Sequence, residues 1–170
     1  MTTTVTSHEL RHATKNDLSE LVRAEVVPLL NQRLADAIDL QLQAKQAHWN
    51  VKGPGFIALH ELFDRVVEHA AGAADLLAER VVQLGGTAEG TVRIAARRSE
   101  LDEYPHAIAG GSDHVAALSG ALAAFGARMR HAIDETAEQG DAASADLCTE
   151  IVRGTDKLLW FVEAHGQASD

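Results

Sequence analysis

Two pairs of residues that commonly bind metal ions lie within one stretch of the sequence, 60–79. His60 and Asp64 are four residues apart, and so are Asp75 and Glu79. In an α-helix this spacing stacks the two side chains of a pair on one face. The eleven residues from Asp64 to Asp75 make close to three turns, so the four side chains fall at about 0°, 40°, 60° and 100° around the helix. A histidine and three carboxylates on one narrow stripe suit a divalent metal ion such as Fe(II).

One copy of this helix cannot close a metal site by itself. The centres of the two pairs are 15 residues apart, which is about 22 Å along a helix and further than a carboxylate side chain reaches. An antiparallel second copy, as in a two-fold symmetric dimer, would bring the first pair of one chain to the second pair of the other. The axis would pass between residues 69 and 70, beside the small residues of 70–74, which allow two helices to approach closely.

His48, near the end of the preceding helix, is the expected third ligand beside His60 and Asp64. A single histidine or aspartate is more often a solvated surface residue, and alanine-rich runs are common in helical bundles. The metal interpretation therefore depends on the five residues as a set, and not on any one of them.

Four long helices are predicted to carry these residues. The apolar periodicity and the glycine and proline stop signals predict helices over 18–49, with a break or start near Pro28, and over 56–84, 112–138 and 143–165. Residues 91–98 are expected to form a short helix in the long connection between the second and third helices. The expected inner stripes are Leu30, Leu34, Ile38 and Leu42 in the first helix, Val115, Leu118, Leu122, Phe125, Met129 and Ile133 in the third, and Leu147, Ile151, Leu158 and Val162 in the fourth.

This order of elements predicts an all-α fold, a ferritin-like four-helix bundle with a short helix in its long connection. The expected organisation is a flexible tail over 1–17, one bundle domain over 18–166 and a short tail over 167–170. The core must be mainly aliphatic, because only 4% of the residues are aromatic. Cys148, between apolar neighbours, is expected to be a small core residue.

The net charge of −10 argues against nucleic acid as the default partner and agrees with a protein that handles cations. An ordinary acidic protein would have the same balance. The sequence shows no leader-like pattern and no apolar run of the roughly 18 residues that cross a membrane. We expect a cytoplasmic protein without a membrane partner.

Four motifs resemble those of the Dps family, the miniature ferritins of starved bacteria. They are Lys-Gln-Ala-His48-Trp49-Asn-Val-Lys-Gly, Phe-Ile-Ala-Leu-His60-Glu-Leu-Phe-Asp64, Asp75-Leu-Leu-Ala-Glu79-Arg-Val-Val-Gln-Leu-Gly-Gly and Lys157-Leu-Leu-Trp160-Phe-Val-Glu. The resemblance extends over residues 24–165. Ordinary ferritins hold their iron ligands inside one bundle, whereas the Dps type shares them between subunits.

The resemblance implies a hollow homododecamer, built from two-fold dimers, that oxidises Fe(II) with hydrogen peroxide or dioxygen and stores ferric oxide in its cavity. It implies that each ferroxidase centre takes His48, His60 and Asp64 from one subunit and Asp75 and Glu79 from its partner. The sequence leaves open whether zinc competes with iron for these ligands. Trp49 resembles the tryptophan near this centre in the family, and packing at the interface is its other possible role.

Two acidic residues at the start of the fourth helix, Asp141 and Asp146, resemble those that line the three-fold pores of the family's shells. Rings of carboxylates would attract Fe(II). The alternative for Asp141 is a helix N-cap, because Asp is a preferred residue at that position.

The alternative function is protection of DNA in the nucleoid with little iron chemistry. Family members that bind DNA do so through a lysine-rich tail. Residues 1–17 carry two cations, Arg11 and Lys15, against Glu9 and Asp17, and no Lys or Arg lies in 163–170. We therefore expect weak DNA binding or none. A third possibility is other chemistry on the same fold, such as metal-dependent hydrolysis.

Overall fold

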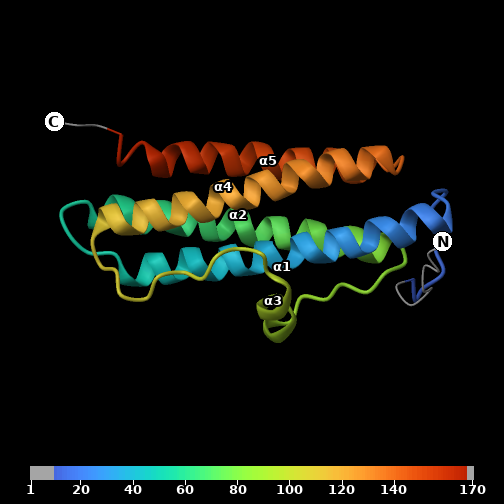
Figure 1. The fold of residues 1–170 in the computed structure, drawn as a ribbon, viewed down its shortest axis with the longest axis horizontal. Coiled ribbons are helices and arrows are strands. Elements are labelled where there is room, and N and C mark those ends of the chain that lie inside the picture. Colours follow the sequence, from blue (N-terminus) through green and yellow to red (C-terminus); the bar gives the residue numbers. More distant parts are fainter. Residues whose placement is uncertain (1–9, 168–170) are drawn as a thin grey trace, which may run out of the picture.

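The computed structural model describes residues 10–167 and shows five helices in that part of the chain (Figure 1). They are α1 (Glu20–Asn50), α2 (Phe56–Gln83), α3 (Val92–Arg98), α4 (Gly111–Glu138) and α5 (Ala142–Glu163). The four long helices form a bundle, and the short α3 lies beside α1 in the connection between α2 and α4. The predicted fold class, a four-helix bundle with a short helix in the long connection, is confirmed.

The long connection decides the direction in which the helices run. Short turns join α1 to α2 and α4 to α5, so each pair forms an antiparallel hairpin (Figure 1). The connection over 84–110 returns along the bundle to the turn between α1 and α2, where the N–H of Lys52 donates to the carbonyl of Ala109 at 2.9 Å. Consequently α2 and α4 run parallel to each other, which two short turns alone could not achieve.

Glycines end two of the long helices, and a side-chain cap starts α5, close to the positions that the sequence predicts. Gly85 has a φ of +87°, and after it the N–H of Gly86 donates to the carbonyl of Val81 at 3.0 Å, a pattern that closes α2. At the other end of the chain, Gly140 has a φ of +86° and the side chain of Asp141 accepts from the N–H of Ser144 to begin α5. The ends of the five helices lie within two residues of the predicted ones.

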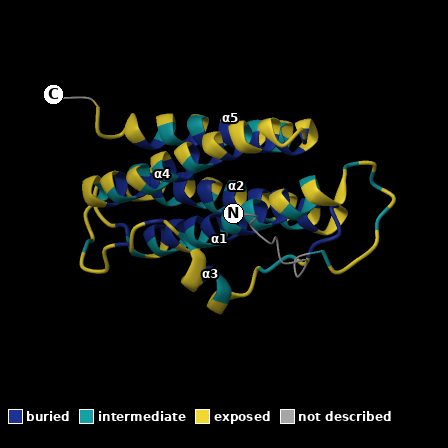
Figure 2. Ribbon diagram, turned by 45° about the vertical axis from the view of Figure 1, so that its right-hand side comes forward, coloured by how far each residue is buried: buried dark blue, intermediate teal, exposed yellow. Residues whose placement is uncertain are grey.

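The core lies between the inner faces of the four long helices (Figure 2). Its largest fully buried side chains are Phe63, Phe125 and Met129 together with many leucines. Cys148 is fully buried among them, as predicted, and burial raises the pKa of its thiol to about 12. The thiol is therefore a small apolar group and not a nucleophile.

The predicted break at Pro28 is wrong, because α1 runs through the proline without interruption. Pro28 lacks the N–H that an interior position of a helix would use, at a cost of about 3 kcal/mol. Residues on both sides, Val26, Val27 and Leu30, are buried in the core. Burying one such side chain contributes about 1.5–3 kcal/mol, so the packing of this face outweighs the missing hydrogen bond.

The inner stripe of α1 departs from the predicted one towards its C-terminal end. Leu30 and Leu34 are buried as expected, but Ile38 is half-buried and Leu42 is 48% exposed. Each step of four residues advances 40° beyond a full turn, so a strict four-residue stripe leaves the core after three steps. Ala37, Leu40 and Ala44 continue the buried face instead.

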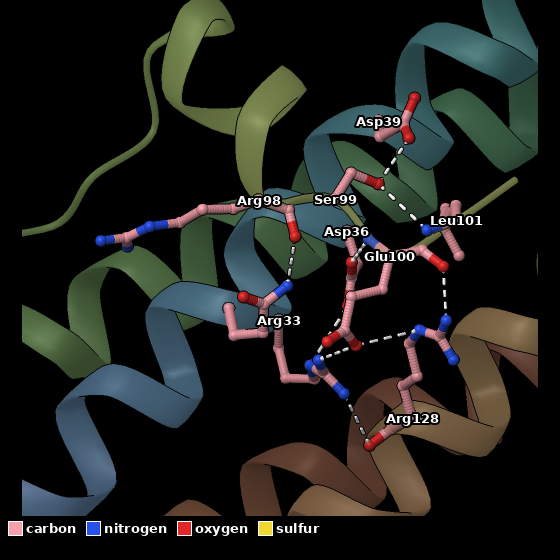
Figure 3. A network of polar contacts seen from close by, with 9 residues as sticks. Arg33, Asp36, Asp39, Arg98, Ser99, Glu100, Leu101 and Arg128 are labelled. Atoms are coloured by element: carbon pink, nitrogen blue, oxygen red, sulfur yellow. Dashed lines mark hydrogen bonds and ion pairs between the residues drawn. The ribbon is translucent and has the colours of Figure 1, made fainter. Parts of the chain in front are cut away.

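A network of charged groups holds the long connection against the bundle (Figure 3). Asp36 on α1 is fully buried, pairs with Arg33 at 3.2 Å and accepts from the N–H of Glu100 at 2.9 Å. The carboxylate of Glu100 in turn bridges Arg33, at 2.9 Å, and Arg128 of α4, at 3.3 Å. Burial raises the pKa of Asp36. The hydrogen bond from the backbone of Glu100 and the positive charge of Arg33 oppose that rise. The network joins three segments that lie far apart in the sequence.

Part of the predicted N-terminal tail is bound to the bundle. The N–H groups of Arg11 and His12 both donate to the carbonyl of Gly85, at 2.9 and 3.1 Å. Residues 1–9 and 168–170 lie outside the described residues. Within the described range, 10–167, no helix is both long and apolar enough to cross a membrane.

Candidate metal centre

The ends of the first helical hairpin bring His48 and His60 into direct contact. Nδ1 of His48 lies 2.8 Å from the carbonyl oxygen of His60, and Nδ1 of His60 lies 2.9 Å from the carbonyl oxygen of His48. The two imidazole rings stack with 3.6 Å between their centroids and 23° between their planes. This reciprocal pair fixes the orientation of both rings.

The hydrogen bonds also determine which nitrogen of each ring can bind a metal. A carbonyl oxygen only accepts hydrogen bonds, so Nδ1 must carry the proton in both rings. In the neutral form of each ring the lone pair is then on Nε2, and this is the form in which imidazole binds metal ions. A backbone carbonyl behind the ligating ring is a common support for metal-binding histidines, because it fixes the tautomer and the orientation.

Asp64, the third residue of this half of the predicted site, already has a cationic partner. One turn before His48, Lys45 places its ammonium 2.6 Å from Oδ1 of Asp64. The same oxygen lies 3.4 Å from Nδ1 of His48. The hydrogen bond from Lys45 is the largest cause that lowers the pKa of Asp64, and Coulombic interactions with His48, Lys45 and His60 act in the same direction. The carboxylate is ionised, partly exposed and available to a metal ion that competes with Lys45.

Asp75 and Glu79 lie on the same helix but are not brought to the histidines. Both are exposed on α2, and the centres of the two pairs remain about 22 Å apart along the helix axis. Across residues 10–167, no three His, Cys, Asp or Glu side chains lie close enough together to hold a metal ion. Among the described residues the structure brings the two histidines of one half together but does not arrange them with Asp64 as a group of three metal ligands, and the set of five would require a second chain.

The small residues beside the predicted two-fold axis divide between two faces of α2. Ala70 and Ala73 are buried in the core of the same chain. Ala71 and Ala74 are half-buried and Gly72 is exposed, so only these three remain for a helix crossing. His69 is turned towards α5, where its Nε2 lies 2.9 Å from Oγ1 of Thr155. Two of the four alanines are therefore small because they pack inside the core of their own chain.

Aromatic and aliphatic side chains surround the exposed side of the histidine pair. Trp49 is 64% exposed, and the ring of Phe56 lies 5.0 Å from that of His60. Ile57 is also largely exposed. Apolar groups left in solvent next to half of a metal site suit a surface that another subunit covers.

The structure separates the two pore candidates. Asp141 is buried, caps α5 and pairs with Arg80 of α2 at 2.8 Å. Its carboxylate also accepts from the hydroxyl of Ser144 at 2.5 Å. Asp146, one turn further along, is exposed. The geometry of Asp141 is that of the N-cap alternative, and Asp146 remains the candidate for a pore.

Lys45 is the residue of this site that the sequence analysis missed. A lysine in a helix is normally solvated, so the residue type alone did not indicate that Lys45 belongs to the site. Its position could have indicated this, because Lys45 is three residues before His48 and must lie on the same face of α1.

Comparisons with known proteins show which family the chain resembles. A family model of the ferritin-like domain matches residues 27–168. A curated relative from Agrobacterium fabrum, called DNA protection during starvation protein, is 46% identical over 156 residues, covering 92% of this chain and 96% of the relative. A solved Dps structure from Mycobacterium smegmatis has a TM-score of 0.87 at 33% identity and covers 92% of this chain and 95% of that one. A Dps structure from Microbacterium arborescens, described as a high iron form, has a TM-score of 0.82 at 35% identity and covers 91% and 99%.

Proposed function

We propose, from the premise that the chain belongs to the Dps family of ferritin-like proteins, that it oxidises Fe(II) at sites shared between two subunits. Membership of this family implies a role in iron storage and protection. The finer proposal names the site: His48, His60 and Asp64 of one subunit with Asp75 and Glu79 of its partner. The ferric product would be stored inside a closed shell of identical subunits.

The observation that carries this proposal is the reciprocal bonding of His48 and His60. The Nδ1–H of each ring donates to the carbonyl of the other residue, which leaves Nε2 of both rings as the nitrogen that can bind a metal ion. Two histidines placed only for packing would not need matching tautomers beside an ionised carboxylate. The exposed Asp75 and Glu79 supply the remaining oxygen ligands if a partner is antiparallel.

The ligand set favours loss of an electron from bound Fe(II). Carboxylates are hard anionic ligands and stabilise Fe(III) relative to Fe(II). Two Fe(II) ions held together give two electrons to one hydrogen peroxide, which with two protons yields two Fe(III) ions and two molecules of water. Paired delivery releases little hydroxyl radical, whereas a single Fe(II) gives only one electron. Dioxygen is the alternative oxidant, and zinc competes for the same ligands.

The proposed assembly is a homododecamer built from two-fold dimers. The acidic net charge of −10 per chain suits attraction of Fe(II) to its pores, where Asp146 is the proposed lining residue. No observation favours DNA protection as the main activity, and we do not propose it.

The decisive test of the function loads the metal-free protein with Fe(II) under anaerobic conditions and adds stoichiometric peroxide. Ferric absorbance and particle size are measured on the same sample. We expect fast oxidation with the iron retained in a shell of constant size. Precipitated ferric oxide, formed at the rate seen without protein, would overturn the proposal.

A further inference from the structure

A buried tyrosine and a buried histidine form a hydrogen-bonded pair at the start of α4. The hydroxyl of Tyr104, in the long connection, lies 2.7 Å from Nδ1 of His114 in the first turn of α4. Tyr104 is 7% exposed and His114 is 1% exposed. Tyr104 is the single tyrosine of the sequence. Neither residue belongs to the predicted metal ligands.

The direction of this hydrogen bond follows from acidity. A phenol is a much stronger acid than the N–H of a neutral imidazole, so the hydroxyl donates and Nδ1 accepts. Nε2 of His114 is buried without a hydrogen-bond partner within the described chain. Burial raises the pKa of Tyr104 to about 12. Burial also lowers the pKa of His114, more than Asp113 and the backbone of Asn50 raise it. At neutral pH the pair is an uncharged phenol beside an uncharged base.

We infer that Tyr104 and His114 form an oxidisable pair that supplies a single electron to a one-electron oxidant generated in the protein. The inference rests on the proposed function for the source of that oxidant, which is the hydroxyl radical formed when one Fe(II) meets one hydrogen peroxide. Removal of an electron from a phenol makes it a strong acid, so its proton must leave at once. A base already hydrogen-bonded to the hydroxyl receives that proton without any movement of the chain.

The step balances as follows. The O–H bond of Tyr104 breaks, its electron passes to the hydroxyl radical, and its proton forms a new N–H bond on Nδ1 of His114. The products are hydroxide, a neutral tyrosyl radical and a protonated imidazole. A later Fe(II) returns one electron to the tyrosyl radical, and the proton goes back from His114 to the oxygen. Over both steps two Fe(II) ions have reduced one peroxide, although they arrived singly.

The position of the pair suits this role. The ring of His114 packs against Phe63, with 6.4 Å between centroids, and Phe63 immediately precedes Asp64 on α2. The backbone of Asn50, two residues after His48, is also near enough to His114 to raise its pKa. The pair therefore lies next to both segments that carry the histidine half of the centre. It is also shielded from solvent, which protects a radical from side reactions.

A purely structural role for the same hydrogen bond would be to anchor the long connection to α4. An anchor and an oxidisable pair respond differently to electron removal, so the test measures the radical directly. The assembled, metal-free protein receives less Fe(II) than it has proposed sites, then equimolar peroxide, and is frozen within seconds for electron paramagnetic resonance. We expect the signal of a neutral tyrosyl radical, which narrows when the protein is produced with ring-deuterated tyrosine. Because the chain has one tyrosine, this isotope test assigns the radical without any substitution.

Variants then test the roles of the two residues. Tyr104→Phe should abolish the signal, while Trp160→Phe, which changes an exposed tryptophan, should leave it. His114→Gln keeps the phenol but removes the base, and should slow radical formation by about a hundredfold, the low end of what a positioned base contributes.

An iron-free arm separates this inference from the proposed function. Hexachloroiridate(IV), a one-electron oxidant, is added to the metal-free protein, and the deuterium-sensitive radical is sought again. If ferric absorbance develops normally but neither arm gives a tyrosine signal, the inference is wrong and the iron chemistry stands. If the iron arm fails and the iridate arm gives a radical that depends on His114, the pair is supported and the proposed function fails.

Discussion

The ammonium of Lys45 lies 2.6 Å from Oδ1 of Asp64, so a lysine occupies a predicted metal ligand in the metal-free chain. Lys45→Met should raise the pKa of Asp64 towards 3.8, because the hydrogen bond that chiefly lowers it is lost. A lowered pKa stabilises the fold above pH 3.8, and this contribution disappears as the pH falls through the folded value. Carbon-13 NMR of the Asp64 carboxyl measures the change.

The same substitution should tighten metal binding at the histidine half of the site. In this variant the metal ion no longer competes with the ammonium for Asp64. A partly exposed ion pair contributes at most about 1 kcal/mol, so the affinity for the metal should rise by roughly fivefold. Titration calorimetry with Zn²⁺ reports this without any oxidation chemistry. Lys52→Met is the matched control, since Lys52 is exposed beyond the end of α1. Equal affinities in the two variants would show that Lys45 does not compete with the metal.

Removal of one ligand should suppress oxidation and leave the assembly intact. Glu79→Ala changes an exposed residue and His60→Ala a half-buried one outside the hydrophobic core, so neither opens a core cavity. We expect fast Fe(II) oxidation to be lost in both, with the particle size unchanged by light scattering. Glu61→Ala, an exposed carboxylate on α2 outside the predicted set, is the control. An active Glu79→Ala shell would remove this residue from the site.

Asp141 and Asp146 should respond in opposite ways. Asp141→Ala leaves the buried Arg80 without its partner and removes the cap of α5, so unfolding should become easier by roughly 3–5 kcal/mol. Asp146→Asn should change stability by less than about 0.5 kcal/mol and slow iron uptake at low salt. Thermal unfolding and initial uptake rates measure the two effects. A stable Asp141→Ala variant, or an uptake rate unaffected in Asp146→Asn, would contradict the respective assignment.

The assembled protein should bind duplex DNA weakly or not at all at pH 8 and physiological salt. Each chain carries a net charge of −10, and binding to DNA depends on cations that displace its counterions. Arg93 and Arg97 on α3 are two of the exposed cations outside the predicted tail. Gel-shift titration is the measurement. Complexes at submicromolar protein would refute the expectation, and their loss in Arg93→Ala/Arg97→Ala would identify α3 as the contact.

The helices were predictable because their stop signals are local. Gly85 and Gly140 adopt positive φ values where the sequence predicts ends. Pro28 misled the prediction, because its cost is local whereas the compensating burial of Val26, Val27 and Leu30 depends on the rest of the bundle. Periodicity alone cannot weigh these two contributions.

The site was predictable where helical spacing determines it and not elsewhere. His48 and His60 lie on opposite sides of a turn, and their reciprocal hydrogen bonds depend on the path of that turn. Tyr104 lies in an irregular segment without any period, so no pattern pairs it with His114. The burial of Asp141 against Arg80 likewise joins residues 61 positions apart.

The central claim, that each site combines residues of two chains, is tested most directly by mixing two inactive variants. One carries His60→Ala/Asp64→Ala and the other Asp75→Ala/Glu79→Ala. In a mixed two-fold dimer one site is wholly intact and the other has lost both halves, so random pairing should restore about a quarter of the wild-type rate. The measurement is the initial rate of Fe(II) oxidation after joint refolding, with mixed dimers verified by native mass spectrometry. A rate near one quarter is the predicted result, and a rate no higher than that of either variant alone, with mixed dimers present, would contradict the shared site.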